Sequence, residues 1–149
     1  MPVQEKTIQS GTDNRTYPEI ERIYHEWDKA LSRNDPAALL ALYAGDAELE
    51  SPLVPHLLGT EKGVCRGHDE LRKFFEILAT RKPSVRRFYR TGYFTDGRKV
   101  MWEYPHETPQ GEQMDFVEVM EIEKGLIRKH RVYWGWFGFN VLKNDRYHA

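Results

Sequence analysis

The sequence MDFVEVMEIEKGLIRKHRVYWGW, residues 114–136, consists of two runs of β-branched and aromatic residues joined by a short turn. Such runs favour strands, and a glycine between them marks a turn, so the stretch predicts a β-hairpin. A two-residue turn would force Lys124 to a positive φ, which is unfavourable for a residue other than glycine. We therefore expect a three-residue loop, Glu123–Gly125, in which Gly125 alone is left-handed.

The length of this loop decides which side chains meet on the hairpin. With three residues in the loop, Ile122 pairs with Leu126, and Glu118 lies opposite His130. The face that carries this acid and this imidazole is otherwise largely apolar: Phe116, Met120, Val132 and Trp134. A two-residue turn would instead pair Val119 with His130 and separate the imidazole from Glu118.

The residues before the hairpin predict helices first and strands afterwards. Apolar residues at helical spacing, with breaks at prolines, predict three helices and one short strand between them: helices over about 18–33, 36–43 and 67–81, and the strand over 46–51. The segment 53–66 is predicted to be a loop that covers part of the molecule. Everything after Pro83 is predicted to be strand, in runs over 85–94, 99–107 and the hairpin.

This order of elements indicates the α+β class, because the helices and the antiparallel strands are segregated along the chain. A strongly curved antiparallel sheet would wrap around the N-terminal helices and leave a pocket between them. We expect residues 1–17 to form a flexible N-terminal arm and residues 18–149 to form a single domain.

The composition excludes several classes of protein. A net charge of −1 gives no strong electrostatic case for binding nucleic acid or an anionic membrane. The single cysteine, Cys65, allows no internal disulfide, which suits a reducing cytoplasm. The sequence has no apolar run long enough for a transmembrane helix and no signal-peptide core, so we expect a cytoplasmic location.

Two motifs resemble those of a known superfamily. They are Trp27-x7-Asp35-x7-Tyr43-Ala44-x-Asp46-Ala47-x3-Ser51-Pro52 and Gly67-x3-Leu71-Arg72-x-Phe74-Phe75. They resemble the nuclear transport factor 2-like superfamily, and within it the SnoaL-like group of polyketide cyclases, ketosteroid isomerases, limonene epoxide hydrolases and dehydratases. The resemblance covers about residues 18–139 and implies a cone-shaped α+β barrel with one deep pocket, often dimeric through the outer face of the sheet.

The departures from these relatives bear on the reaction. Ketosteroid isomerases place an aspartate base before the proline that closes the first strand, where this chain has Ser51, and a tyrosine where it has Trp27. Their protonated aspartate matches Glu118. The Asp-Arg-Asp relay of limonene epoxide hydrolases is absent: its final-strand aspartate falls on Val132, and the other two positions fall near Tyr104 and His106.

Glu118 and His130 are the sharpest candidates for acid–base catalysis, because histidine changes its charge near neutral pH and a neighbouring carboxylate can share the proton. The alternative is a buried pair that only holds the sheet in register. His106, on the strand 99–107, would reach the rim of the pocket or lie exposed near a turn. These three residues have no tight metal-ligand spacing, so we expect no metal site.

Several aromatic residues could share one face of the pocket and bind a flat or cyclic apolar ligand. The predicted substrate-binding residues are Tyr24, Trp27, Tyr43, Trp102, Tyr104, Val132 and Trp134, with Ser51 and His56 at the pocket mouth by resemblance. Aromatic residues at helical or strand spacing are also typical of an ordinary core.

Two hypotheses about function follow. The first is a cofactor-independent isomerase, dehydratase or cyclase that acts on a small apolar cyclic molecule, with Glu118, His130 and His106 as catalytic residues. The second is a non-catalytic ligand-binding or dimerisation module of the same fold. In both, the expected partners are a small apolar ligand and a second copy of the chain in a homodimer.

Overall fold

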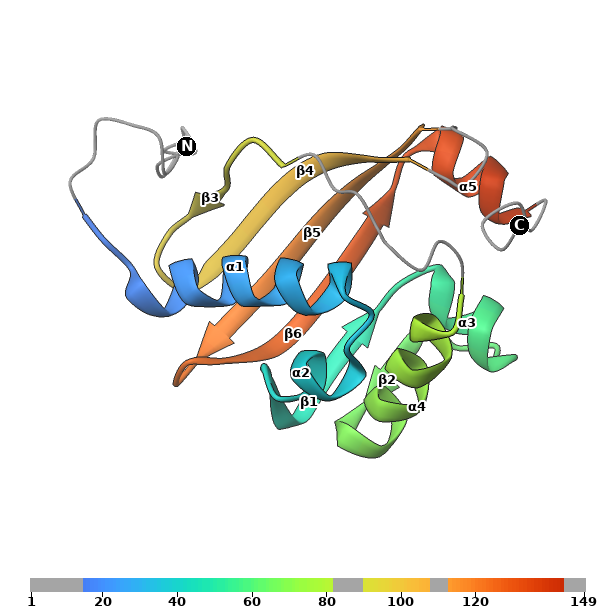
Figure 1. The fold of residues 1–149 in the computed structure, drawn as a ribbon, viewed down its shortest axis with the longest axis horizontal. Coiled ribbons are helices and arrows are strands. Elements are labelled where there is room, and N and C mark those ends of the chain that lie inside the picture. The colour runs from blue at the N-terminus through green and yellow to red at the C-terminus, as the bar shows by residue number, and fades with distance from the viewer. Residues whose placement is uncertain (1–14, 82–89, 108–112, 144–149) are drawn as a thin grey trace.

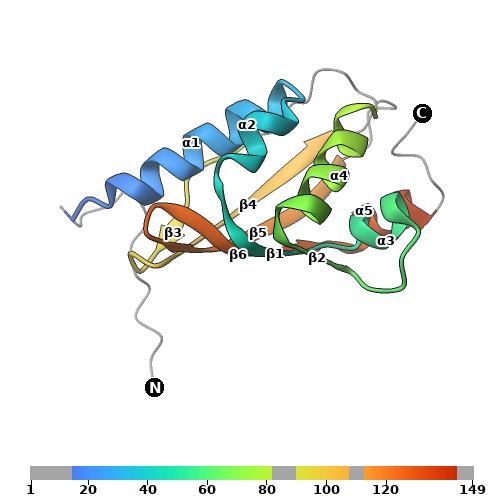
Figure 2. The same ribbon diagram turned by 90° about the horizontal axis from the view of Figure 1, so that it is seen from below.

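The computed structural model describes residues 15–81, 90–107 and 113–143. Its strands form one sheet with the order β2-β1-β6-β5-β4-β3, and its helices lie mainly on one face of that sheet (Figures 1 and 2). The α+β class and the curved sheet are confirmed. Within the described residues the edge strands β2 and β3 are not paired with each other, so the sheet is open and is not a closed barrel.

The helices begin where their sequences predict, but α2 ends at Leu40 and not near Tyr43, because β1 already begins at Tyr43. Helix α1 (Pro18–Ser32) has Pro18 in its first turn, and α2 (Pro36–Leu40) is capped by the Asp35 carboxylate, which accepts a hydrogen bond from the Ala38 N–H at 3.0 Å. Helix α4 (Gly67–Ala79) buries the predicted stripe of Leu71, Phe74, Phe75 and Leu78. Each such side chain contributes about 1.5–3 kcal/mol by leaving water.

The strands are β1 (Tyr43–Glu50), β2 (Val64–Arg66), β3 (Phe94–Thr95), β4 (Lys99–Glu107), β5 (Gln113–Glu123) and β6 (Leu126–Trp134). All neighbours are antiparallel except β1 and β6, which are parallel. The last strand therefore lies between the first strand and β5, near the middle of the sheet.

The turn of the β5–β6 hairpin differs from the prediction. It has two residues, Lys124 and Gly125, and both have positive φ, 53° and 76°. The positive φ of Lys124 costs free energy, and this cost is offset because the twist of a type I′ turn matches the twist of the two strands. A β-bulge follows: Ile122 pairs with Ile127 but Glu121 pairs with Lys129, so Arg128 is the extra residue.

The bulge reverses the effect of the shorter turn on the two faces of the hairpin. A two-residue turn alone would place His130 opposite Val119, whereas the extra residue places it opposite Met120. Glu118 is paired with Val132, so the predicted direct pairing of Glu118 with His130 is wrong. Both residues nevertheless lie on the inner face, as diagonal neighbours.

Two further predictions of secondary structure are wrong. The loop predicted over 53–66 contains α3 (Leu53–Leu58) and β2. Helix α3 begins where the Leu53 N–H donates to the Ser51 hydroxyl at 3.1 Å, and it ends at Gly59 with φ 65°. The C-terminal segment Trp136–Lys143 is not strand but helix α5, because packing against β5 overrides the strand propensity of its aromatic residues.

The strand predicted over 85–94 lies partly outside the described residues. Of its described part, Phe94 alone belongs to a strand, β3. Residues 90–93 follow an irregular path because their polar groups bond to α1. The predicted flexible arm, residues 1–17, also lies mostly outside the described residues.

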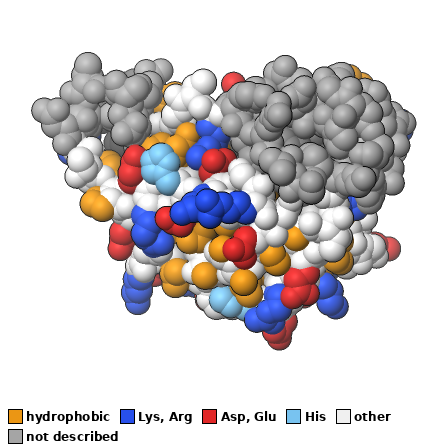
Figure 3. Space-filling model, viewed as in Figure 1, with side chains coloured by type: hydrophobic (Ala, Val, Ile, Leu, Met, Phe, Trp, Pro, Cys, Tyr) orange, Lys and Arg blue, Asp and Glu red, His pale blue; other side chains and the backbone are white. Residues whose placement is uncertain are grey.

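The core lies between the inner face of the sheet and helices α1, α2 and α4, with α3 and α5 at one end of the sheet (Figures 1 and 2). On the coloured part of the face in Figure 3, acidic and basic side chains are interspersed among apolar ones. No helix within the described ranges combines the length and apolarity that a bilayer span requires.

The first prediction concerns the strained turn. Replacing Lys124 with Asn should raise the free energy of unfolding by about 0.5–1 kcal/mol, because Asn adopts the left-handed conformation at lower cost. Urea denaturation measures the change. The matched control is Lys124→Ala, which removes the same charge but keeps the strain; an equal gain in both variants would show that the backbone conformation is not the cause.

Candidate functional site

Glu118 on β5 and His130 on β6 meet on the inner face of the sheet. The His130 Nε2 lies 2.6 Å from the Glu118 Oε1, and the two residues are 2% and 3% exposed. The sequence predicts that this acid and this imidazole lie side by side, and the contact agrees with that prediction. It arises through diagonal packing across the bulged hairpin and not through direct pairing.

His130 is held on its other side by β1. The Tyr43 hydroxyl lies 2.8 Å from His130 Nδ1, and the Trp27 indole N–H donates to the same hydroxyl at 3.2 Å. We call these four residues, Trp27, Tyr43, His130 and Glu118, the hydrogen-bond series. It joins α1, β1, β6 and β5, and all four side chains are buried.

Within the described contacts, one assignment of donors and acceptors gives every N–H and O–H of the series an acceptor. Burial raises the pKa of Tyr43 far above its ordinary value, so its hydroxyl keeps its proton. Among the residues that the structure describes, the acceptor for that proton is His130 Nδ1, because Trp27 approaches Tyr43 as a donor. His130 Nδ1 therefore accepts from Tyr43, and the Nε2–H donates to the Glu118 carboxylate.

Aromatic rings pack around this series. Trp102 on β4 contacts Tyr24 and Trp27 edge to face, with ring centroids 5.1 and 5.5 Å apart, and Trp27 also meets the His130 ring at 5.7 Å. Trp102 is 1% exposed, and its indole nitrogen is buried without a hydrogen-bond partner in the described structure. Of the predicted aromatic residues, Tyr24, Trp27 and Trp102 are thus gathered at one place, where they form a packed wall.

The other predicted residues are distributed around this centre. Val132 and Trp134 follow His130 on the inner face of β6 and are half-buried. Ser51 is buried and its hydroxyl bonds to the start of α3, whereas His56 is exposed on α3. Tyr104 and His106 lie on β4, but their side chains are outside the described residues, so their roles stay predictions.

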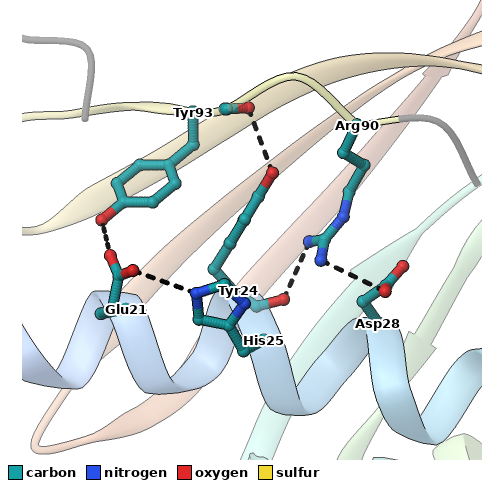
Figure 4. A network of polar contacts seen from close by, with 7 residues as sticks. Glu21, Tyr24, His25, Asp28, Arg90 and Tyr93 are labelled. Atoms are coloured by element: carbon teal, nitrogen blue, oxygen red, sulfur yellow. Dashed lines mark hydrogen bonds and ion pairs between the residues drawn. The ribbon is translucent and has the colours of Figure 1, made fainter. Parts of the chain in front are cut away.

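Sequence reasoning missed Arg90, which packs beside the aromatic wall (Figure 4). Its guanidinium lies 3.7 Å from the centre of the Tyr24 ring and 5.4 Å from that of Trp102. It also donates to the Tyr24 carbonyl at 2.8 Å and pairs with Asp28 at 3.3 Å. Nothing in the local sequence predicts this, because Arg90 precedes β3 in an irregular segment.

The same irregular segment is tied to α1 at two further points (Figure 4). The Tyr93 hydroxyl donates to Glu21, whose carboxylate also contacts His25 at 3.0 Å, and the Tyr24 hydroxyl donates to the Gly92 carbonyl at 3.4 Å. The Tyr93 hydrogen bond lowers the pKa of Glu21. Residues 90–93 are therefore anchored along α1.

Two clefts in the described part of the structure lie away from the hydrogen-bond series. One, of about 410 Å³, is lined by charged residues such as Arg98, Lys99 and Glu123 at the hairpin end of the sheet. Another, of about 570 Å³, lies between α3 and α4. Neither is lined by the hydrogen-bond series, so the predicted deep pocket stays a prediction.

The structure gives little support for a cysteine nucleophile or for a metal site. Burial raises the pKa of Cys65 to about 11, so it stays a thiol and is a poor nucleophile. Within the ranges that the structure describes, no three His, Cys, Asp or Glu side chains come together in a group that could hold a metal ion.

A family model for the SnoaL-like domain matches residues 20–130. The chain belongs to the SnoaL-like domain family. The match covers α1 to His130 and so contains every member of the hydrogen-bond series. No curated protein matches the chain in sequence.

Similar solved structures agree on the fold. A SnoaL-like protein of unknown function from Burkholderia thailandensis has a TM-score of 0.68 at 19% identity, covering 80% of this chain and 97% of that one. TerC, co-crystallised with polyporic acid, has a TM-score of 0.67 at 20% identity, covering 85% and 98%. A candidate ketosteroid isomerase from Kribbella flavida has a TM-score of 0.62 at 17% identity, covering 80% and 79%. At such identities the likeness shows the fold and not the reaction.

The second prediction tests the hydrogen-bond series. Tyr43→Phe should lower the free energy of unfolding by about 1–3 kcal/mol, because it leaves two buried groups, Trp27 Nε1 and His130 Nδ1, without their partner. Urea denaturation measures the loss. Tyr133→Phe is the control, since Tyr133 is 55% exposed on the outer face, and it should change stability by less than about 0.5 kcal/mol. Equal effects would contradict the series.

Proposed function

We propose that this SnoaL-like domain is an enzyme that moves a proton on a small, apolar, cyclic carbonyl compound. The reaction would be an isomerisation, a dehydration or an aldol-type cyclisation. The observation that carries the proposal is the buried His130–Glu118 contact at 2.6 Å, an acid–base pair enclosed by aromatic rings. Burial excludes water and so strengthens every charge effect at the pair.

In this proposal Glu118 is the catalytic base and His130 is a positioning residue. Both nitrogens of His130 already have partners, Tyr43 and Glu118, so the imidazole cannot reach a substrate without breaking one of these bonds. Its Nε2–H orients the Glu118 carboxylate and stabilises the charged form by a charge-assisted hydrogen bond. Tyr43 and Trp27 hold His130 in the tautomer that makes this possible.

The burial gradient along β6 supports an approach of the ligand from the α5 end of the sheet. His130 is buried, whereas Val132 and Trp134, which follow it on the same face, are half-buried. A flat apolar ligand would lie against these two side chains, with its reacting carbon toward Glu118. TerC, a neighbour of the same fold, was crystallised with polyporic acid, which supports ligand binding by a domain of this shape.

The alternative is a non-catalytic module, and one observation favours it. Glu118 and His130 are only 3% and 2% exposed, as expected for a pair whose role is to hold the sheet together.

A homodimer is compatible with either candidate. The outer face of the sheet carries exposed apolar side chains, Met101 and Tyr133, which supports a homodimer formed through that face. Sedimentation of the protein as a monomer would contradict the dimer.

The third prediction separates the two candidates without knowledge of the natural substrate. In D₂O, the protein should catalyse deuterium uptake at the carbon next to the carbonyl in cyclic ketones such as cyclohexenone, indanone or tetralone. Mass spectrometry measures the uptake. Glu118→Gln should slow it by about 10²-fold or more, because the general base is lost while the shape of the side chain is kept.

Glu121→Gln is the matched control for that experiment. Glu121 lies on the same strand but faces outward, where it accepts a hydrogen bond from Arg131 at 2.9 Å. This variant should exchange at the wild-type rate. Ketones that bind the wild type, as shown by tryptophan fluorescence, but never take up deuterium would support the non-catalytic module and refute the enzyme.

A further inference from the structure

Trp102 is a residue of the aromatic wall whose indole nitrogen has no hydrogen-bond partner in the described structure. It lies on β4 directly opposite Glu118 on β5, with their Cα atoms paired in the sheet. Side chains of such a pair lie on the same face with Cβ atoms about 4.5–5.5 Å apart. The indole of Trp102 and the proposed base are therefore immediate neighbours on the inner face.

The indole N–H of Trp102 is a buried donor without an acceptor. The residue is 1% exposed, and its Nε1 has no hydrogen-bond partner in the described structure. Trp27, in contrast, donates to Tyr43, and Trp136 is 81% exposed. Buried donors nearly always find an acceptor, so an unpartnered one beside an acid–base pair indicates that a ligand supplies it.

The Trp102 ring is also held in place before any ligand arrives. Tyr24 packs against it at an interplanar angle of 88°, Trp27 at 65°, and the Arg90 guanidinium lies 5.4 Å from its centre. Arg90 itself is fixed by Asp28 and by the Tyr24 carbonyl. A donor fixed in this way requires no reorganisation when negative charge develops nearby, and the cation beside the ring favours that charge.

We infer that the Trp102 indole N–H binds the carbonyl oxygen of the substrate and stabilises the negative charge that forms there. This rests on the proposed function and specifies its substrate class as enolisable cyclic ketones. The Glu118 carboxylate removes a proton from the carbon next to the carbonyl. The C–H electron pair becomes the C=C bond of the enolate, and the carbonyl π pair moves to the oxygen held by Trp102. The neutral Glu118 exchanges its proton with the solvent and then delivers a proton, or in D₂O a deuteron, to carbon.

The test uses para-nitrophenolate as the probe, since it is flat and cyclic and its phenolate oxygen carries partial negative charge, as the oxygen of an enolate does. Titration into ¹⁵N-labelled protein should move the Trp102 indole proton resonance downfield, while the resonance of the exposed Trp136 stays unchanged. Trp102→Phe and Trp136→Phe assign the two resonances. A saturating titration that leaves the Trp102 resonance in place, or no binding at all, would overturn the inference.

Two variants extend the test to affinity. Trp102→Phe keeps an aromatic ring but lacks the N–H, so it should bind para-nitrophenolate at least about tenfold more weakly, the effect of one hydrogen bond to a charged oxygen. Glu118→Gln should bind it as well as the wild type or better, because a negative charge beside the anion is removed. Wild-type affinity in a folded Trp102→Phe variant would contradict the assignment.

Ketone exchange distinguishes failure of this inference from failure of the proposed function. Trp102→Phe should slow deuterium uptake by about 10²–10³-fold, as for loss of one oxyanion donor. Exchange that depends on Glu118 without any shift of the Trp102 resonance would leave the enzyme proposal standing and refute the donor. A shifted resonance without exchange would support the donor as a binding group and refute the catalysis.

Discussion

The hydrogen bond between His130 and Glu118 is the contact on which the rest of the structure depends. A buried carboxylate without a partner would be strongly destabilising, and removing one member of such a pair typically costs about 3–5 kcal/mol. The pair can form only if both residues face inward. A slip of one residue in the β5–β6 register would turn His130 toward the outer face and leave Glu118 alone in the core.

This requirement links elements that are distant in the sequence. The bulge at Arg128 exists in a hairpin whose two-residue turn would otherwise place His130 on the wrong face. Tyr43 brings β1 alongside β6 through its contact with His130 Nδ1, and Trp27 adds α1 through its bond to Tyr43. The same contacts that define the fold therefore define the protonation of the imidazole and the orientation of Glu118.

Because the contacts of Glu118 and His130 both stabilise the fold and orient the carboxylate, a structural role and a catalytic role are each consistent with the geometry of the site. A carboxylate that stabilises the sheet by accepting a hydrogen bond can also act as a base toward a bound substrate. What distinguishes the catalytic interpretation is the neighbour across the strand: Trp102 presents a fixed and buried N–H that the fold itself does not use. A purely structural core has no need of such a donor.

The sequence predicts more of the inner face than of the segments that close it. The alternation of apolar side chains with Glu118 and His130 on the hairpin is a local pattern, so the face could be predicted although the turn and the bulge could not. The bulge reflects the tertiary demand that His130 face inward. Helix α5 was missed because its aromatic residues favour strands, and Arg90 because its contacts with Tyr24 and Asp28 join positions far apart in the chain.

The most direct test of this account is the protonation of the two His130 nitrogens, measured at neutral pH by long-range ¹H–¹⁵N correlation spectra of the imidazole. The account predicts one protonated nitrogen, Nε2, bonded to Glu118, and one unprotonated nitrogen, Nδ1, accepting from Tyr43. The Nδ1–H tautomer, or an imidazolium with both nitrogens protonated, would contradict it, because the Tyr43 proton would then lack an acceptor and Glu118 would not be oriented as proposed.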